Sequence, residues 1–180
     1  MKTTEILIAG FGGQGILFSG KFLAYKGLIE ELQVSWLPSY GPEMRGGTAN
    51  CNVILSDDPV GSPIIAHPNV LMVMNEPSLD KFEDTVAPGG TIFVDSSLIS
   101  RKVRRTDVDV VYIPATQMAK DMEAPSLANM VILGAIAEKL RCVSPDTVAD
   151  ALKETISARK ANLLEFNLKA VEAGRSFIRG

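Results

Sequence analysis

Residues 6–15 read Ile6-Leu7-Ile8-Ala9-Gly10-Phe11-Gly12-Gly13-Gln14-Gly15, and this stretch decides the fold class. Its first four residues form a short apolar run typical of a buried strand, and apolar residues at helical spacing follow from Ile16 to Ile29. Gly10, Gly12 and Gly15 match the pattern G-x-G-x-x-G. A strand, a glycine-rich turn and a helix in this order are typical of the opening of a doubly wound α/β fold.

The remaining chain continues the alternation of strands and helices. Further strands are predicted at Leu32–Leu37, Ala49–Leu55, Val70–Met74, Thr91–Val94 and Val108–Ile113. Further helices are predicted at Ser78–Val86, Thr116–Met122, Leu127–Leu140, Ser144–Ile156 and Asn162–Ile178. Because no long helix separates the second strand from the third, we allow an antiparallel element there. We expect an α/β fold with a single doubly wound, mostly parallel sheet domain over residues 1–180, a Rossmann-like glycine-rich first turn and C-terminal helices.

Composition limits the classes of function. The chain has 180 residues, of which 46% are hydrophobic, and its formal net charge is −3. This is enough for one ordinary core, and it differs from the basic balance of most nucleic-acid-binding proteins. The one basic cluster, Arg101-Lys102-Val103-Arg104-Arg105, is interpreted as a solvated loop. With no signal region and no apolar stretch near the ~20 residues that span a bilayer, we expect a cytoplasmic protein with neither nucleic-acid nor membrane partners.

Cysteine and histidine are too few to indicate a metal or redox site. Cys51 and Cys142 lie far apart, neither belongs to a CxxC pair, and His67 is the single histidine. We therefore predict two buried thiols that act as small hydrophobic side chains, and an ordinary surface histidine. Without a second histidine or a suitably placed cysteine no catalytic triad can be drawn, so we assign no catalytic residue and no metal ligand.

The glycine-rich turn Gly10–Gly15 is the first candidate binding element. Backbone N–H groups and a helix N-terminus favour an anion such as phosphate, and Gln14 adds a side-chain amide at the mouth of the turn. Two readings stay open with equal weight, namely anion binding and a turn that packs the helix against the strand. An NAD site also requires an acidic residue at the end of the second strand. That strand ends Leu37-Pro38-Ser39-Tyr40, while Glu30 and Glu31 precede it, which disfavours an NAD enzyme.

The loop Tyr40-Gly41-Pro42-Glu43-Met44-Arg45-Gly46-Gly47 is the second candidate. Arg45 can hold a phosphate or carboxylate through two N–H groups, and Glu43 can orient that group or contact a neighbouring subunit. An ion pair between the two side chains is the alternative. Asn129 is a polar residue on an otherwise apolar helix, so it needs a hydrogen-bond partner if it is buried. For Asn129 we favour a structural bond to a loop over a contact with a ligand.

Four segments together resemble the gamma subunit of a 2-oxoacid:ferredoxin oxidoreductase: Gly10–Gly15, Ser39–Gly47, Ile54–Asp57 and Asn129–Ala135. The resemblance covers nearly the whole chain, and the loop from Tyr40 to Gly47 is its most specific part. It implies a complex that oxidatively decarboxylates a 2-oxoacid on thiamine diphosphate with Mg²⁺. Such a complex passes two electrons through iron–sulfur clusters to ferredoxin and delivers the acyl group to coenzyme A.

Within such a complex the resemblance implies an accessory role, inactive alone. The chain has no Gly-Asp-Gly followed by an asparagine segment to hold thiamine diphosphate, and two cysteines cannot ligate a four-cysteine cluster. The resemblance therefore implies alpha, beta and ferredoxin-like partner subunits that supply these groups. It favours 2-oxoglutarate over pyruvate or branched-chain acids. It also implies help with the coenzyme A half-reaction, for which the candidate residues are Gly10, Gly12, Gly13, Gln14, Gly15, Arg45 and Asn129.

Two other functions remain open. One is a free-standing Rossmann-like nucleotide-binding enzyme, which requires an acidic residue closing the second strand and a catalytic acid or base in the crevice. The other is a non-catalytic scaffold module, in which Arg45 serves assembly alone.

Overall fold

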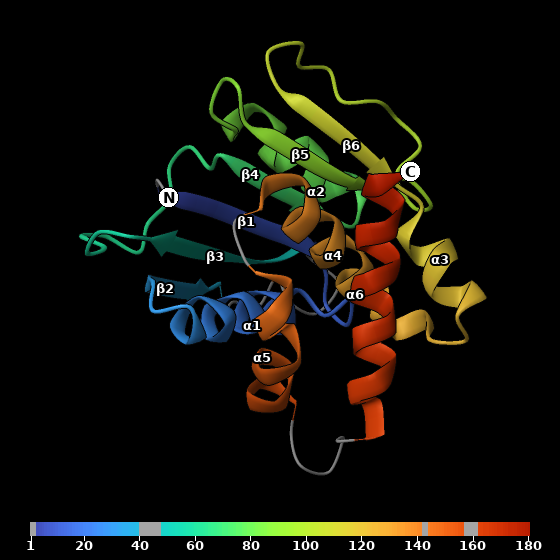
Figure 1. Ribbon diagram of the computed structural model, residues 1–180. Helices are drawn as coiled ribbons and strands as arrows, with labels where there is room; N and C mark the ends of the chain where they lie inside the picture. The colour runs from blue at the N-terminus through green and yellow to red at the C-terminus, as the bar shows by residue number, and fades with distance from the viewer. Residues whose placement is uncertain (1–2, 40–47, 142–143, 157–161) are drawn as a thin grey trace.

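The computed structural model describes residues 3–39, 48–141, 144–156 and 162–180, and its strands form one mixed sheet (Figure 1). The strands are β1 (Thr4–Phe11), β2 (Gln33–Pro38), β3 (Thr48–Ser56), β4 (Val70–Val73), β5 (Thr91–Asp95) and β6 (Asp109–Ile113). The α-helices are α1 (Ile16–Ile29), α2 (Glu76–Phe82), α3 (Ala115–Asp121), α4 (Ala128–Leu140), α5 (Val148–Thr155) and α6 (Leu164–Arg179). Within these ranges no helix is both long and apolar enough to cross a lipid bilayer.

The strand order is β2-β3-β1-β4-β5-β6. β1, β4, β5 and β6 pair in parallel, whereas β3 runs antiparallel to both β1 and β2. The α/β prediction is therefore confirmed, including the antiparallel element. β3 lies between β1 and β2, so the helix α1 joins two strands that are not neighbours in the sheet.

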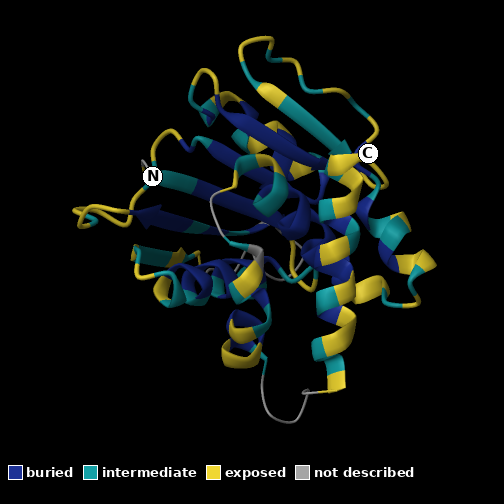
Figure 2. Cartoon of the chain, in the orientation of Figure 1, coloured by how far each residue is buried: buried dark blue, intermediate teal, exposed yellow. Residues whose placement is uncertain are grey.

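Each face of the sheet carries its own apolar core (Figure 2). On one face the side chains of Ile6 and Ile8 pack with residues of α1, α4, α5 and α6. On the other face Leu7 and Ala9 pack with Leu79 of α2 and with the segment that follows β5. Because the chain covers both faces, every residue of β4 and β5 is buried. This agrees with the doubly wound arrangement expected from the short apolar runs.

Local hydrogen bonds mark where two helical segments begin. The Asn75 side chain accepts the N–H of Ser78 at 2.8 Å, so α2 begins two residues before the predicted start at Ser78. Before α5, the Ser144 hydroxyl accepts the N–H of Asp146 at 3.2 Å. A single tight helical turn at Pro145–Thr147 then leads into α5, so the helical segment begins directly after Ser144, where the predicted helix starts.

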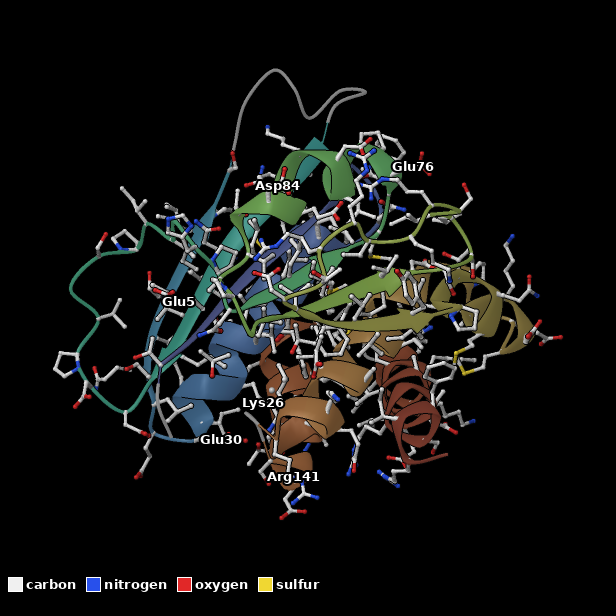
Figure 3. The ribbon with its side chains drawn as sticks, turned by 90° about the horizontal axis from the view of Figure 1, so that it is seen from above. Glu5, Lys26, Glu30, Glu76, Asp84 and Arg141 are labelled. Carbon is white, nitrogen blue, oxygen red and sulfur yellow. The ribbon has the colours of Figure 1, made fainter. Side chains whose placement is uncertain are left out.

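A buried ion pair ties the end of α1 to the start of the C-terminal helices. Lys26 is fully buried, and its ammonium group lies 2.5 Å from the carboxylate of Glu30 (Figure 3). It also contacts the carbonyl oxygen of Ser144 and the hydroxyl of Thr147. The same Glu30 oxygen accepts the Ser144 N–H at 2.8 Å and the Thr147 hydroxyl at 2.7 Å. The buried charge of Lys26 is thus paired with one carboxylate and contacts two further oxygen atoms, as a buried charge requires.

The helices α4 and α6 touch backbone to backbone. A Cβ atom added to Gly134 would lie 2.0 Å from the carbonyl oxygen of Val171, and one added to Gly174 would lie 1.8 Å from that of Val131. No side chain fits at either position. All residues of α4 from Ala128 to Ile136 are buried, so this helix is packed on both sides.

We therefore expect Gly174→Ala to lower the free energy of unfolding by about 3 kcal/mol, because the new methyl group forces the two backbones apart. The measurement is urea denaturation followed by the fluorescence of Trp36, the single tryptophan. Gly61→Ala is the matched control, since a Cβ there meets nothing within 4 Å, and its effect should stay within about 0.5 kcal/mol. Equal effects of the two substitutions would contradict the close contact of α4 and α6.

Candidate functional site

The glycine-rich turn lies between the end of β1 and the start of α1, as predicted. Gly13 and Gly15 have φ of 96° and 76°, which favours glycine at both positions. Gly12 and Gly13 are exposed, and the N–H of Gln14 closes the turn on the carbonyl of Phe11 at 3.2 Å. From β1 the chain continues to strands on one side in the sheet, and from β4 it continues to strands on the other side, so the strand order reverses between β1 and β4. Ligands of open α/β sheets bind beyond the carboxyl ends of the strands at such a point.

The amide of Gln14 braces the turn instead of facing a ligand. Its Oε1 accepts the N–H of Phe11 at 2.6 Å, and its Nε2 donates to the carbonyl of Met74 at 2.9 Å. Both ends of the amide are therefore engaged within the chain. The amide is therefore not free at the mouth of the turn, which differs from the arrangement expected for Gln14. The sequence could not reveal this role because Met74 is 60 residues away, in the segment after β4.

Asn129 holds the start of α1 against α4. It is 2% exposed, and its Nδ2 donates to the carbonyl of Gly15 at 3.3 Å and to the hydroxyl of Ser19 at 3.0 Å. Ser19 in turn donates to the same Gly15 carbonyl at 3.0 Å. A Cβ at Gly15 would lie 2.5 Å from Asn129 Nδ2, so a side chain is excluded there. The predicted structural bond between the Asn129 helix and a loop is confirmed.

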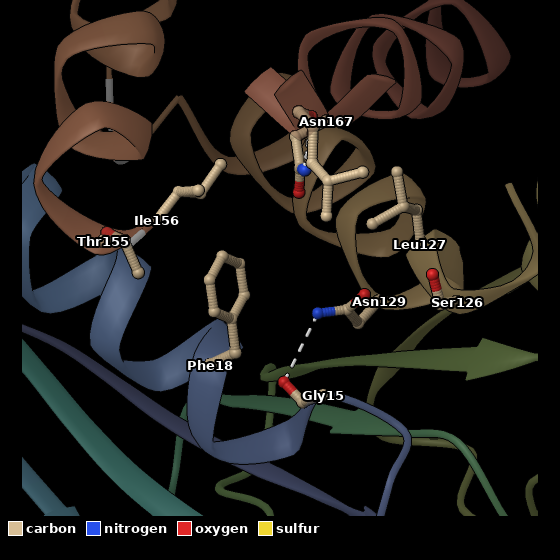
Figure 4. A pocket seen from close by; sticks show the side chains of 9 residues that line it. Gly15, Phe18, Ser126, Leu127, Asn129, Thr155, Ile156 and Asn167 are labelled. Carbon is tan, nitrogen blue, oxygen red and sulfur yellow. Dashed lines mark hydrogen bonds between the residues drawn. The ribbon is translucent and has the colours of Figure 1, made fainter. Parts of the chain in front are cut away.

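Two hollows meet at Gly15 and Phe18. The first, of about 270 Å³, lies over the turn and is lined also by Gly12, Gly13 and Leu17. The second, of about 380 Å³, lies between α1, α4, α5 and α6 (Figure 4). Its other lining residues are Ser126, Leu127, Asn129, Thr155, Ile156, Leu163 and Asn167. The first hollow adjoins the N–H groups of the first helical turn, which favour an anion.

Asn167 is a site residue that the sequence interpretation missed. It is 2% exposed and lies on α6, which the sequence indicated mainly as a helix with a broad apolar face. The available signal was an asparagine on that face, since such a residue needs a reason to be buried. Phe18, which lines both hollows, gave no signal because one more apolar residue on an apolar helix is unremarkable.

The geometry also disfavours a nicotinamide dinucleotide. The strand beside β1 on that side is β3, and because it is antiparallel, its first residue Thr48 pairs with Phe11 at the end of β1. The end of a parallel second strand, where the ribose-binding acid stands, is therefore absent from this position. Glu30, one of the two acidic residues before β2, is engaged with Lys26.

The loop from Tyr40 to Gly47 lies outside the described residues, so the structure does not place Glu43 or Arg45. Its flanking strands are described. The N–H of Ser39 donates to the carbonyl of Asn50 at 2.9 Å, and Ala49 lines the hollow over the turn. Ala49, near the start of β3, therefore lies beside the glycine-rich turn.

Arg101 and Arg105 of the basic cluster at residues 101–105 are paired with carboxylates, which corrects the solvated-loop interpretation for these two residues, whereas Lys102 and Arg104 are exposed. Arg101 lies 2.7 Å from carboxylate oxygens of both Asp80 and Glu83. Arg105 lies 2.6 Å from Asp107, and its hydrogen bond lowers the pKa of that carboxyl. Glu83 is 3% exposed and also accepts the backbone N–H of Arg105 at 3.2 Å. The cluster therefore fastens the segment after β5 to α2.

The predictions for Cys51 and His67 are confirmed. Cys51 is fully buried, its Sγ donates to the carbonyl of Ile16 at 3.5 Å, and burial raises the pKa of its thiol to about 12. His67 is exposed. Cys142 lies outside the described residues. Over the part of the chain that the structure describes, no three side chains of His, Cys, Asp or Glu gather as metal ligands would.

Comparison with known proteins gives a consistent result. A family model described as pyruvate ferredoxin/flavodoxin oxidoreductase matches residues 5–177. Ketoisovalerate oxidoreductase subunit VorA of Methanothermobacter thermautotrophicus is 41% identical over 97% of this chain and 36% of its own length. The 2-oxoglutarate synthase subunit KorC of Methanocaldococcus jannaschii is 34% identical over 91% of this chain and 90% of its own. The chain thus spans little more than a third of the VorA relatives.

Two solved structures share the fold. The gamma subunit of the keto/oxoacid ferredoxin oxidoreductase from Geobacter sulfurreducens PCA matches with a TM-score of 0.84 and 28% identity, over 97% of this chain and 98% of its own. The 2-oxoglutarate:ferredoxin oxidoreductase from Magnetococcus marinus, solved with 2-oxoglutarate, coenzyme A and succinyl-CoA bound, matches with a TM-score of 0.88 and 27% identity. That match covers 99% of this chain and 31% of the larger protein.

We expect the Cys51 thiol to resist alkylation in the native protein. A thiol with a pKa of about 12 is almost entirely protonated at pH 8, so its reaction with iodoacetamide should be roughly a thousandfold slower than that of an ordinary cysteine. Mass spectrometry of the Cys51 peptide measures the rate, with the protein unfolded in urea as the control. Equal rates in the native and unfolded protein would contradict a buried, protonated thiol.

Proposed function

Because the chain belongs to the pyruvate ferredoxin/flavodoxin oxidoreductase family and corresponds to its gamma subunit, we propose that it is the accessory subunit of a multisubunit 2-oxoacid:ferredoxin oxidoreductase. The complex oxidatively decarboxylates a 2-oxoacid to an acyl-CoA and passes the electrons to ferredoxin. The observation that carries the proposal is the match of the whole described fold to a gamma subunit, with 28% identity over 97% of the chain. We further propose that residues 1–180 form one cytoplasmic domain.

The redox cofactors belong to partner subunits in this proposal. The chain has two cysteines, whereas an iron–sulfur cluster takes four ligands, and the described residues offer no group of metal-binding side chains. The residues present therefore do not fit a cluster or the Mg²⁺ of thiamine diphosphate. Alpha, beta and ferredoxin-like subunits would supply both, and ferredoxin would meet the complex rather than this chain.

The role of this chain in catalysis would be to help hold coenzyme A. Three features support this: the exposed Gly12 and Gly13, the N-terminus of α1, and the hollow of about 270 Å³ above them. Gln14 contributes by bracing the turn, Gly10 and Gly15 by allowing its shape, and Asn129 by fixing the Gly15 carbonyl. Arg45, in the segment between β2 and β3, would bind a phosphate of coenzyme A through two N–H groups.

For the 2-oxoacid, we propose 2-oxoglutarate as the first substrate to test. Relatives named 2-oxoglutarate synthase subunit KorC align along 91–97% of this chain. A branched-chain acid is the second candidate, because the ketoisovalerate subunit VorA has the higher identity of 41%.

The complex itself is the first test. The tagged chain, purified without oxygen from its own host, should co-purify with subunits that carry thiamine diphosphate and iron–sulfur clusters, detected by native mass spectrometry. The preparation should reduce a viologen dye only when both a 2-oxoacid and coenzyme A are present. A colourless, inactive monomer or homodimer after the same gentle purification would contradict the proposal. It would favour a free-standing nucleotide-binding enzyme instead.

Arg45→Ala distinguishes a coenzyme A ligand from a scaffold. If Arg45 binds phosphate, the KM for coenzyme A should rise about tenfold while the KM for the 2-oxoacid and the subunit composition stay unchanged. Arg45→Lys, which keeps the charge but loses the two-pronged contact, should recover part of the affinity. A scaffold module predicts instead that subunits are lost from Arg45→Ala and that the remaining complex binds coenzyme A normally.

A further inference from the structure

The connection from β3 to β4 is much longer than the gap that it crosses. The two strands pair with β1 from opposite sides, where Leu55 lies level with Thr4 and Val70 lies level with Ile6. Roughly 14 Å therefore separates the ends of the connection, and about six residues of extended chain can cross it, even around the end of β1. The chain uses the 13 residues 57–69. Connections of this length without secondary structure are uncommon and usually have a function.

Both ends of the connection are fixed to the body of the fold. The Ser56 hydroxyl accepts the N–H of Asp58 at 3.1 Å and lies 2.9 Å from the hydroxyl of Thr3. At the other end Pro68 is buried, and its carbonyl accepts the N–H of Ala87 at 2.9 Å. The chain therefore leaves and rejoins the fold at defined points, and the excess length lies between them.

The excess length forms an arm, residues 57–67, that projects away from the sheet (Figure 1). Nine of its 11 residues are exposed, and none lies in a helix or a strand (Figure 2). Within the arm the N–H of Ile64 donates to the Ser62 hydroxyl at 3.2 Å. A Cβ atom added to Gly61 would meet nothing within 4 Å. The arm is therefore directed into solvent instead of being packed on its own chain.

The arm carries apolar side chains, in the run Pro63-Ile64-Ile65-Ala66. Ile64 is 71% exposed, the highest value for a large hydrophobic side chain among the residues that the structure describes. The rings of Pro59 and Pro63 fix φ, which lowers the entropy that the arm loses when it is held in one shape. A single exposed apolar side chain is ordinary on a protein surface. On a projecting arm stiffened by prolines, it is placed to enter a recess of another molecule.

The chain itself does not provide that recess. The arm leaves the sheet where the parallel strands begin, whereas the undescribed segment 40–47 is attached where they end, between β2 and β3. Eight residues tied at both ends reach about 17 Å from that edge, but β3 alone is about 27 Å long. The other segments outside the described ranges have at most five residues, too few to surround a side chain.

The comparisons favour a partner of different sequence over a second copy of this chain. This chain matches 36% of the length of VorA from Methanothermobacter thermautotrophicus and 31% of the larger Magnetococcus marinus protein. In both proteins the counterpart of this chain is joined to about twice its own length of other sequence. KorC of Methanocaldococcus jannaschii, matched over 90% of its length, lacks such a large addition and is named a subunit. Surface contacts are then left to hold such a subunit to its partners.

We propose that the arm inserts Ile64 into a hydrophobic recess on a partner subunit of the oxidoreductase. This inference rests on the proposed function, which supplies the partner. Because the arm leaves the edge of the sheet opposite the glycine-rich turn, it can hold the partner while the turn stays open to its ligand. The arm is thus an assembly element, and Ile64 is its anchor.

Ile64→Asp in the complex tests the anchor. A carboxylate cannot enter an apolar recess without losing its hydration, so the Kd between the tagged chain and the other subunits should rise at least tenfold. Native mass spectrometry over a dilution series measures this Kd. Complexes that remain assembled should keep the wild-type KM for coenzyme A. Ile64→Leu, which keeps the apolar area, should stay within about threefold of the wild-type Kd.

Phe177→Asp is the matched control. Phe177 is 42% exposed on the last turn of α6, far from the arm (Figure 1). The same new charge there should change the Kd by less than about threefold. Urea denaturation of the Ile64→Asp chain should give the wild-type midpoint, because Ile64 has little packing within its own chain.

A photocrosslinker identifies the molecule that receives the arm. p-Benzoylphenylalanine in place of Ala66, an exposed residue of the arm, is irradiated in the purified complex. Mass spectrometry of the crosslinked peptides should find apolar residues of another subunit joined to the arm.

Three results would overturn the inference. The first is a Kd for Ile64→Asp within threefold of wild type, and the second is a lower urea midpoint for this variant, which would mean that Ile64 serves its own fold. The third is a crosslink to a second copy of this chain alone. Failure of the proposed function is distinct, because the wild-type chain would then co-purify with no thiamine- or cluster-bearing subunit.

Discussion

The bond from the Asn129 side chain to the Gly15 carbonyl is the contact on which the candidate site depends. It joins the first turn of the chain to a helix that begins more than a hundred residues later, and it fixes the N-terminus of α1. The other end of α1 is held in the same manner, by Lys26 and Glu30 against Ser144 and Thr147. With both ends held by polar contacts to later helices, α1 keeps a defined position between the sheet and the C-terminal helices. Both hollows are formed around that position.

The antiparallel strand β3 changes which ligand the glycine-rich turn can be expected to bind. The glycine-rich turn resembles the first turn of dinucleotide-binding folds, and the structure has the expected strand, turn and helix. Yet β3 occupies the place beside β1 where such a fold has its second parallel strand. The N–H groups at the start of α1 remain able to hold a phosphate, whereas the acidic partner of a ribose has no position. The glycine-rich turn in this fold therefore favours an anion but does not favour NAD.

The second hollow lies beside a tight helix contact and two unpaired polar atoms. The close contact of α4 and α6 at Gly134 and Gly174 needs no side chains and leaves no space. Beyond it, Asn129 and Asn167 keep two buried acceptors without donors among the described residues, and each such atom lowers the stability of the fold.

The sequence by itself determined the alternation of strands and helices, the glycine-rich turn, the helix start at Ser144 and the burial of Cys51. Each of these depends on residues close together in the chain, through periodicity, backbone conformation or composition. Tertiary structure alone decided that Gln14 donates a hydrogen bond to the carbonyl of Met74, that Glu30 pairs with a buried lysine beside α5, and that Arg101 pairs with Asp80 of α2. It also brought Asn167 to the hollow beside Phe18. These contacts join residues that are distant in sequence, so no local pattern specifies them, and only the packing of the helices on the sheet selects the partner.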